Sequence, residues 1–158
     1  MFADVLSFFL LLAPALAAHR TMNMASIKLA EDTSYQWTVE NWEASYGGAY
    51  DFNISAPYSG GQFPVPAFVA HCAGSAATTQ YALCNITDIR NTTRRRQIVS
   101  KLMPATNASS ASLAVSYKFD DLTQSNAWWN YTSYATQLYA ANATDVFAMK
   151  PSEVYGVA

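Results

Sequence analysis

Apolar side chains alternate with polar ones along several short segments of the chain. The pattern is clearest from Leu113 to Phe119, where every second side chain is a large apolar one. A period of two indicates a β-strand with one buried face. The segments that we predict as strands, by this pattern or by a short apolar run, are 35–40, 50–55, 67–72, 80–84, 97–103, 113–120, 128–139 and 146–149.

Residues that favour turns separate these segments. Gly47-Gly48 follows the first, a loop with several Gly and Pro residues covers 57–66, and 74–79 joins the segment that ends at Cys72 to the next one. About eight short strands without an amphipathic helix predict an all-β fold, an antiparallel β-sandwich or β-barrel. We expect a single β-domain over 35–158, preceded by a flexible arm over 18–34.

The N-terminus differs from the rest of the chain. Residues 5–13 are almost entirely apolar, and Ala15-Leu16-Ala17 follows as a small-x-small cleavage pattern. The apolar run is too short to cross a bilayer as a helix, so we predict a signal peptide over 1–17. The mature chain then begins at Ala18, or at His19 if the cut falls one residue later. We expect it to be secreted, extracellular and without a membrane anchor.

Six Asn-x-Ser/Thr triplets follow, none with Pro in the middle. One triplet arises easily by chance, but six behind an apolar N-terminus predict an N-glycosylated protein. If Asn53 is glycosylated it faces solvent, so Phe52 and Ile54 on either side of it point inward. The six asparagines are Asn53, Asn85, Asn91, Asn107, Asn130 and Asn142.

Composition and charge narrow the class of partner. The chain is 51% hydrophobic, which is enough to fill one core, and has a formal charge of −2. Removal of 1–17 takes away one of 11 acidic residues and leaves 9 basic and 10 acidic ones, a charge of −1. A chain so close to neutrality has little electrostatic attraction for nucleic acid or an acidic membrane. We therefore expect an extracellular protein or glycan as the partner.

Cys72 and Cys84 are the two cysteines of the chain, and an oxidising secretory pathway favours a disulfide between them. Closing so short a loop stabilises a fold by roughly 3 kcal/mol. The alternatives are two free thiols, or a metal site that includes His71. Two cysteines and one histidine are a poor ligand set for zinc.

Four short motifs occur in a recognisable order: Trp37-Thr38-Val39-Glu40-Asn41-Trp42, Tyr50-Asp51-Phe52-Asn53-Ile54, Phe68-Val69-Ala70-His71-Cys72 and Tyr81-Ala82-Leu83-Cys84. In this order they resemble the small secreted β-proteins of filamentous fungi, including the family of the Alternaria major allergen, over 35–119. The resemblance implies an allergen-like protein or an effector that interacts with a host, with no catalytic residues. The chain departs from that family at Ser45-Tyr46-Gly47-Gly48, where another cysteine is expected, so a disulfide-linked dimer is not implied.

His19 supports one enzymatic hypothesis. If His19 became the mature N-terminus, its amine and ring, together with His71, would suit Cu(II), as in a copper-dependent polysaccharide monooxygenase. That cut would place Leu16 three residues before the bond, a less favoured choice than Ala15. We prefer the interpretation that His19 belongs to a tail and His71 to a strand, and we expect no metal or other cofactor.

Arg94, Arg95 and Arg96 form a cluster of positive charge. The cluster fits a basic processing site cut after Arg96, or an anion-binding patch for sulfate or phosphate groups. It also fits a set of solvated charges on the edge strand of a sheet, which discourage association between sheets. We prefer this last interpretation, because a cut after Arg96 would divide one core.

The segment 128–139 is rich in aromatic residues, which most often pack in cores. If Asn130 is glycosylated and faces solvent, Trp129 and Tyr131 point inward and Trp128 points outward. Tyr134 shares the outward side. Exposed rings on a sheet can stack on sugars, so Trp128 and Tyr134 are the candidate ligand-binding residues of a carbohydrate-binding module.

Acid–base catalysis has less support. Asp120 and Asp121 are adjacent, so in a strand their carboxylates point to opposite faces. The chain has no Gly-x-Ser-x-Gly, His-Glu-x-x-His or phosphate-loop motif, and a Ser-His-Asp site would have to use His71 beside a disulfide. We therefore predict no catalytic residues and a protein that acts by surface recognition outside the cell.

Overall fold

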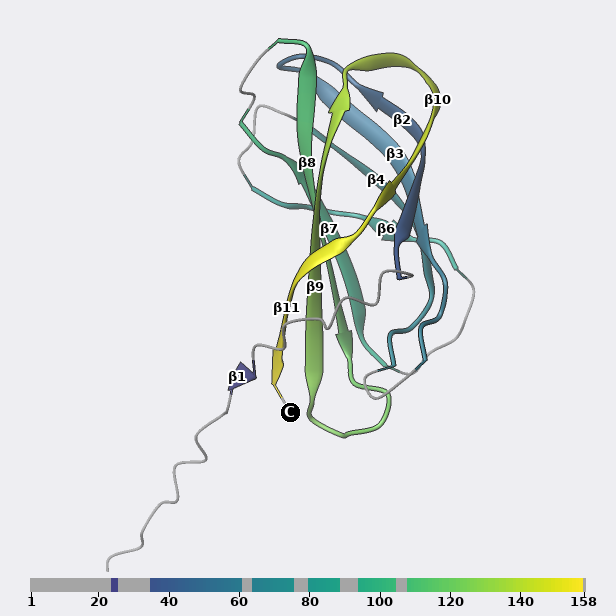
Figure 1. The fold of residues 1–158 in the computed structure, drawn as a ribbon, viewed down its shortest axis with the longest axis vertical. Helices are drawn as coiled ribbons and strands as arrows, with labels where there is room; N and C mark the ends of the chain where they lie inside the picture. Colours follow the sequence, from purple (N-terminus) through teal and green to yellow (C-terminus); the bar gives the residue numbers. More distant parts are fainter. Residues whose placement is uncertain are drawn as a thin grey trace, which may run out of the picture.

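The computed structural model describes residues 24–25, 35–60, 64–75, 80–88, 94–104 and 108–157. These residues form a sandwich of two antiparallel β-sheets (Figure 1), which confirms the all-β fold class. Within these ranges we find no helix long and apolar enough to cross a membrane. The predicted signal peptide, most of the predicted arm, His19, Asn91 and Asn107 lie outside the described residues.

One sheet has six strands in the order β1-β11-β9-β8-β7-β5. Its centre is the hairpin of β8 and β9, whose register runs from Ser110 opposite Leu138 to Asp120 opposite Trp128. The strands are β1 (Met24–Ala25), β5 (Ala82–Leu83), β7 (Arg96–Leu102), β8 (Ser110–Asp120), β9 (Trp128–Leu138) and β11 (Pro151–Val157).

The other sheet has five strands in the order β10-β2-β3-β4-β6. The register of β2 and β3 shifts between Glu40 and Glu43, next to Asn41, whose φ of 56° is a left-handed conformation that asparagine tolerates. The strands are β2 (Trp37–Ala44), β3 (Ala49–Ala56), β4 (Phe68–Ser75), β6 (Asn85–Ile86) and β10 (Ala140–Met149).

The core lies between the two sheets and is rich in aromatic rings. Phe52 and Ile54 are buried, as the alternation along β3 predicts. Phe68 of the five-stranded sheet meets Tyr117 of the six-stranded sheet, with ring centroids 4.5 Å apart. Removing these large apolar surfaces from water is the main force that holds the two layers together.

The chain passes from one sheet to the other at both lateral edges of the sandwich. At one edge Cys84 lies between β5 and β6, which belong to different sheets, and its disulfide to Cys72 joins this crossing to β4. This bond between Cys72 and Cys84 confirms the predicted disulfide. At the other edge Lys150 separates β10 of the five-stranded sheet from β11 of the six-stranded sheet.

Several predicted elements need correction. The segments 67–72 and 80–84, predicted as two strands joined by a loop, belong to opposite sheets, because the chain changes sheet between β4 and β5 and returns at Cys84. The segment 146–149 is only the end of β10. β11 was not predicted, since Pro151 and Gly156 interrupt its pattern. Met24–Ala25, placed by prediction in a loose arm, pairs with β11.

Candidate binding face on the six-stranded sheet

Alternate side chains of β7, β8, β9 and β11 point away from the core of the sandwich. We call the surface that they form, together with two residues before and within β5, the outer face. Its members are Tyr81, Leu83, Gln97, Val99, Lys101, Ala114, Ser116, Lys118, Trp128, Asn130, Thr132, Tyr134, Glu153 and Tyr155.

Strand register arranges most of the outer face in three rows that run across the strands. Because antiparallel partners share one side of a sheet, residues of one row are neighbours in space. The first row is Gln97, Lys118, Asn130 and Tyr155; the second is Val99, Ser116, Thr132 and Glu153; the third is Lys101, Ala114 and Tyr134.

The centre of the outer face is buried although its side chains point outward. Asn130 is only 6% exposed, and Ser116 and Thr132 are buried as well. Thr132 Oγ1 lies 2.5 Å from Ser116 Oγ and accepts a hydrogen bond of 3.2 Å from Asn130 Nδ2. The Tyr81 hydroxyl, which comes from outside the central strands, lies near Ser116. Larger side chains therefore lie over a connected polar layer.

Those larger side chains are mostly aromatic and remain partly open to solvent. Tyr81 is 40% exposed, Tyr134 45% and Tyr155 40%. Trp128 meets Tyr155 edge-on, with ring centroids 5.8 Å apart. Lys118 Nζ lies 4.1 Å from the centroid of the Trp128 ring. These contacts hold the rings in defined positions on the outer face.

The hydroxyls of Tyr81 and Tyr134 keep their protons at neutral pH. The pKa of Tyr81 is above its usual value, because burial raises it and the effect of the Ser116 hydroxyl, which lowers it, is smaller. Burial also raises the pKa of Tyr134, and the nearby Glu153 carboxylate adds to that effect. The Tyr134 hydroxyl donates to Glu153 Oε2 at 3.2 Å. The Tyr134 hydroxyl can therefore accept a further hydrogen bond while its proton is held by Glu153.

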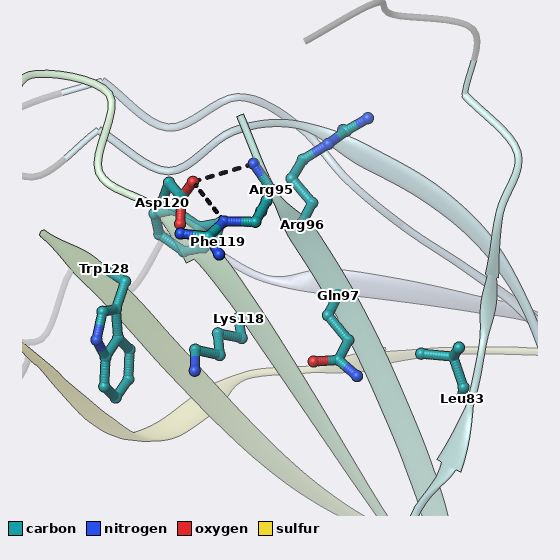
Figure 2. A pocket seen from close by; sticks show the side chains of 8 residues that line it. All are labelled: Leu83, Arg95, Arg96, Gln97, Lys118, Phe119, Asp120 and Trp128. Carbon is teal, nitrogen blue, oxygen red and sulfur yellow. Dashed lines mark hydrogen bonds and ion pairs between the residues drawn. The ribbon is translucent and has the colours of Figure 1, made fainter. Parts of the chain in front are cut away.

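A groove of about 600 Å³ opens at one end of the outer face (Figure 2). The Trp128 ring and the Lys118 side chain lie on one side of it, and the Gln97 side chain lies towards the other. Arg95 lies at its rim, where Nε is 3.4 Å from Asp120 Oδ2 and the side chain is 93% exposed. The residues that line the groove are Leu83, Arg95, Arg96, Gln97, Lys118, Phe119, Asp120 and Trp128.

Trp128 and Tyr134, the two predicted ligand-binding residues, lie on one strand and on the same side of it. At ~3.3 Å per residue they are about 20 Å apart along β9. Trp129 and Tyr131 are buried in the core, as the predicted alternation requires. Sequence reasoning missed Tyr155, because β11 was not predicted, and Tyr81, because its place over β7 depends on the crossing between sheets.

The three consecutive arginines lie in three different environments. Arg96 makes two hydrogen bonds to Asp88, of 2.8 and 2.9 Å, and both side chains are only 9% exposed. Arg94 donates to the backbone carbonyl of Asp121. Arg95 reaches solvent beside Asp120. The structure therefore does not gather these arginines into one anion-binding patch, and of the three only Arg95 has a guanidinium shown to be freely exposed at the groove.

Asp121 is buried and serves the turn between β8 and β9. Its carboxylate accepts hydrogen bonds from Trp129 Nε1 at 2.6 Å, from Thr123 N at 2.6 Å and from Gln124 N at 2.9 Å. Burial alone raises the pKa of Asp121, but these hydrogen bonds outweigh burial and lower the pKa below its usual value. Asp120 points to the other side, so the adjacent carboxylates do not face each other.

The outer side of the five-stranded sheet has a different character. Glu40, Asn53, His71 and Asn85 form one row across β2, β3, β4 and β6. His71 Nε2 lies 2.9 Å from Asp51 Oδ1. Among the described residues no group of three or more His, Cys, Asp or Glu side chains is arranged to hold a metal ion.

Two of the predicted glycosylation sites, Asn53 and Asn85, thus lie on the outer side of the five-stranded sheet. One strand, β4, separates them, which corresponds to about 10 Å between their strands. Asn142 belongs to β10 of the same sheet. Of the sequon asparagines within the described ranges, Asn130 alone lies on the six-stranded sheet.

Comparison of the chain with family models, with curated proteins and with solved structures finds no match. The fold and the surface of the structure therefore define the class of this protein. It is a disulfide-linked β-sandwich in which one sheet presents aromatic rings above a hydrogen-bonded polar layer.

Proposed function

We propose that this is a secreted, N-glycosylated and non-catalytic recognition protein that binds a saccharide on the outer face of its six-stranded sheet. The observation that carries the proposal is the set of partly exposed rings of Tyr81, Tyr134 and Tyr155, held over the polar layer together with Trp128. A sugar ring has apolar C–H surfaces and a rim of hydroxyl groups. It is complementary to an aromatic ring surrounded by hydrogen-bonding groups.

The polar groups needed for such a ligand lie between the rings. Gln97 and Lys118 lie beside Trp128 in the groove, and Glu153 lies beside Tyr134. Because the rings already contact neighbouring side chains, little side-chain entropy is lost when a ligand binds to them. The length of the face along β9, about 20 Å from Trp128 to Tyr134, suits an oligosaccharide rather than a single sugar.

The distribution of glycosylation sites supports the choice of face. Asn53 and Asn85 would carry their glycans on the five-stranded sheet, whereas the burial of Asn130 leaves the outer face uncovered. A secreted protein that shields one sheet and leaves rings open on the other has one surface suited to recognition.

The resemblance to small secreted proteins of filamentous fungi suggests where such a saccharide would be found. A protein of that kind meets fungal wall glycans or the surface of a host. We propose an effector-like or allergen-like role in which the outer face contacts one of these glycans.

The test is retention on insoluble chitin, cellulose and glucan. A double variant, Trp128→Ala with Tyr134→Ala, removes two rings from the outer face, and we expect its affinity to fall about tenfold to a hundredfold. The control double variant is Tyr46→Ala with Tyr58→Ala, which removes two exposed tyrosines from elsewhere. Equal retention of the two double variants and the wild type on every polysaccharide that binds would contradict the proposal.

A further inference from the structure

We infer that the groove at the Trp128 end of the outer face selects an anionic sugar, one that bears a carboxylate or a sulfate. This inference rests on the proposed saccharide binding and adds the charge of the ligand. The ammonium of Lys118 has no carboxylate within 4 Å among the described residues, and it lies over the Trp128 ring.

The groove around Lys118 has an excess of positive charge. Arg96 is neutralised by Asp88, and both side chains are almost fully buried. Asp120 lies 3.4 Å from Arg95, whose side chain is nevertheless 93% exposed. Counting these groups leaves Lys118 as the cation without a matching anion. A protein with a formal charge of −2 thus has a locally cationic groove.

The remaining groups in the groove suit a sugar that carries the anion. The Lys118 ammonium lies over the Trp128 ring, so a sugar packed against the part of the ring that Lys118 leaves open would bring its acidic substituent close to the ammonium. Gln97 is the register partner of Lys118, and its side-chain amide can donate to the same substituent. Hydrogen bonds between charged groups and such donors are stronger than those between neutral groups.

The number of cations indicates one acidic unit and not a polyanion. Proteins that bind nucleic-acid backbones neutralise several phosphates with several basic side chains. Here Lys118 and the partly matched Arg95 face the groove, whereas towards Tyr134 the outer face carries one cation, Lys101, and one anion, Glu153. A saccharide with an acidic sugar at the Trp128 end and neutral sugars towards Tyr134 fits this distribution.

The experiment measures the dissociation constant of the glycosylated secreted protein by calorimetry for matched pairs of ligands. An oligogalacturonate is paired with its methyl ester, an oligoglucuronate with its methyl ester, and a sulfated oligogalactan with the unsulfated chain. We expect at least one anionic ligand to bind about tenfold more tightly than its neutral partner, with the preference shrinking as salt rises. The carboxylate and sulfate pairs show which anion is selected.

Variants separate the charge from the ring beneath it. Lys118→Gln with Arg95→Gln should reduce the preference, which is the ratio of the two dissociation constants within a pair, to less than about twofold. Lys118→Arg should retain the preference, and Lys150→Gln, which removes an exposed lysine elsewhere, should not affect it. Equal binding within every pair overturns the inference and leaves the proposed function intact. Failure to bind any saccharide, neutral or anionic, overturns both.

Discussion

Asn53 and Asn130 carry the same glycosylation signal and both point outward from their strands, yet their surroundings differ. Asn53 is partly exposed in a row of polar side chains. Asn130 lies between Lys118 and Tyr155 and uses its side-chain nitrogen to hydrogen-bond Thr132. That nitrogen is the atom to which a glycan would be attached, so a glycan at Asn130 would displace the polar layer.

We therefore predict that the mature protein carries glycans at Asn53 and Asn85 and none at Asn130. Site-specific mass spectrometry of glycopeptides, with enzymatic removal of glycans in ¹⁸O-water, measures the occupancy of each site. The control is Asn130→Gln, which should leave the total glycan mass unchanged, whereas Asn53→Gln should reduce it. Occupancy at Asn130 equal to that at Asn53 would show that the outer face is covered and would contradict the prediction.

The lowered pKa of Asp121 predicts that the stability of the fold depends on pH. Because its folded-state pKa is lowered, its contribution to stability is present above its unfolded pKa of about 4 and is lost as the pH falls through the folded value. The midpoint of urea unfolding should therefore fall from pH 5 to below pH 4. In the variant Asp121→Asn this decrease in the urea midpoint should be absent. The free energy of unfolding of the variant at pH 7 should be lower than that of the wild type by about 1 to 3 kcal/mol.

Asp120→Asn is the matched control for Asp121→Asn, because Asp120 precedes it in the chain and lies on the more exposed side of β8. It should change stability at pH 7 by less than about 1 kcal/mol. Equal stability and equal pH profiles of the two variants would show that the buried hydrogen bonds of Asp121 do not cause the loss of stability at low pH.

At the scale of elements, the run Arg94–Arg96 is anchored where it enters β7. Arg96 hydrogen-bonds Asp88 and also donates to the carbonyl of Ala67 at 3.0 Å, so one side chain connects β7 with the chain segments next to β4 and β6. A processing protease must bind extended arginines in its own pockets. The burial of Arg96 opposes cleavage at this position and favours an intact chain.

Arg96→Ala should destabilise the protein by about 3 to 5 kcal/mol, because Asp88 would keep a buried and unpaired charge. Arg95→Ala removes a side chain that is almost fully exposed and should cost less than about 1 kcal/mol. Urea unfolding of both variants checks the difference, and the intact mass of the reduced wild type should correspond to one uncut chain. Similar stabilities of the two variants would contradict the assigned roles.

The sequence predicted the long strands well and the connections between sheets poorly. The alternation that ends at Phe119 and the one through Phe52 and Ile54 identify β8 and β3, because one buried face leaves a period of two. β5 and β6 are two residues each, too short to produce a period. Their separation into two sheets at Cys84 depends on packing between distant segments, which no local pattern records.

The candidate site was predictable to a similar extent. The position of Trp128 and Tyr134 on one side of β9 follows from alternation alone. The burial of Asn130 does not follow from alternation. It depends on the rings of Tyr155, from β11, and Tyr81, from the residue before β5, which lie over the central strands. The groove likewise joins residues from β5, β7, β8 and β9, and its charge is set by the pairing of Arg96 with Asp88.

At the scale of the whole molecule, the two outer surfaces of the sandwich are chemically distinct. The five-stranded sheet presents a polar row with two glycosylation signals, and the six-stranded sheet presents aromatic rings and two lysines. At both lateral edges the chain crosses between the sheets, and three of the four edge strands in the described part of the chain, β1, β5 and β6, are only two residues long, which limits strand addition. The proposed binding surface is the outer face of the six-stranded sheet.

Nuclear magnetic resonance of the isotopically labelled, secreted protein tests the central claim most directly. Cello-, chito-, laminari- and galacturono-hexasaccharides are titrated in turn while the amide and indole signals are followed. We predict that a binding hexasaccharide shifts the Trp128 indole and the amides of Lys118, Tyr134 and Tyr155, with little change near Asn53. Shifts confined to the five-stranded sheet, or no shift with any of the four saccharides, would contradict saccharide recognition on the outer face.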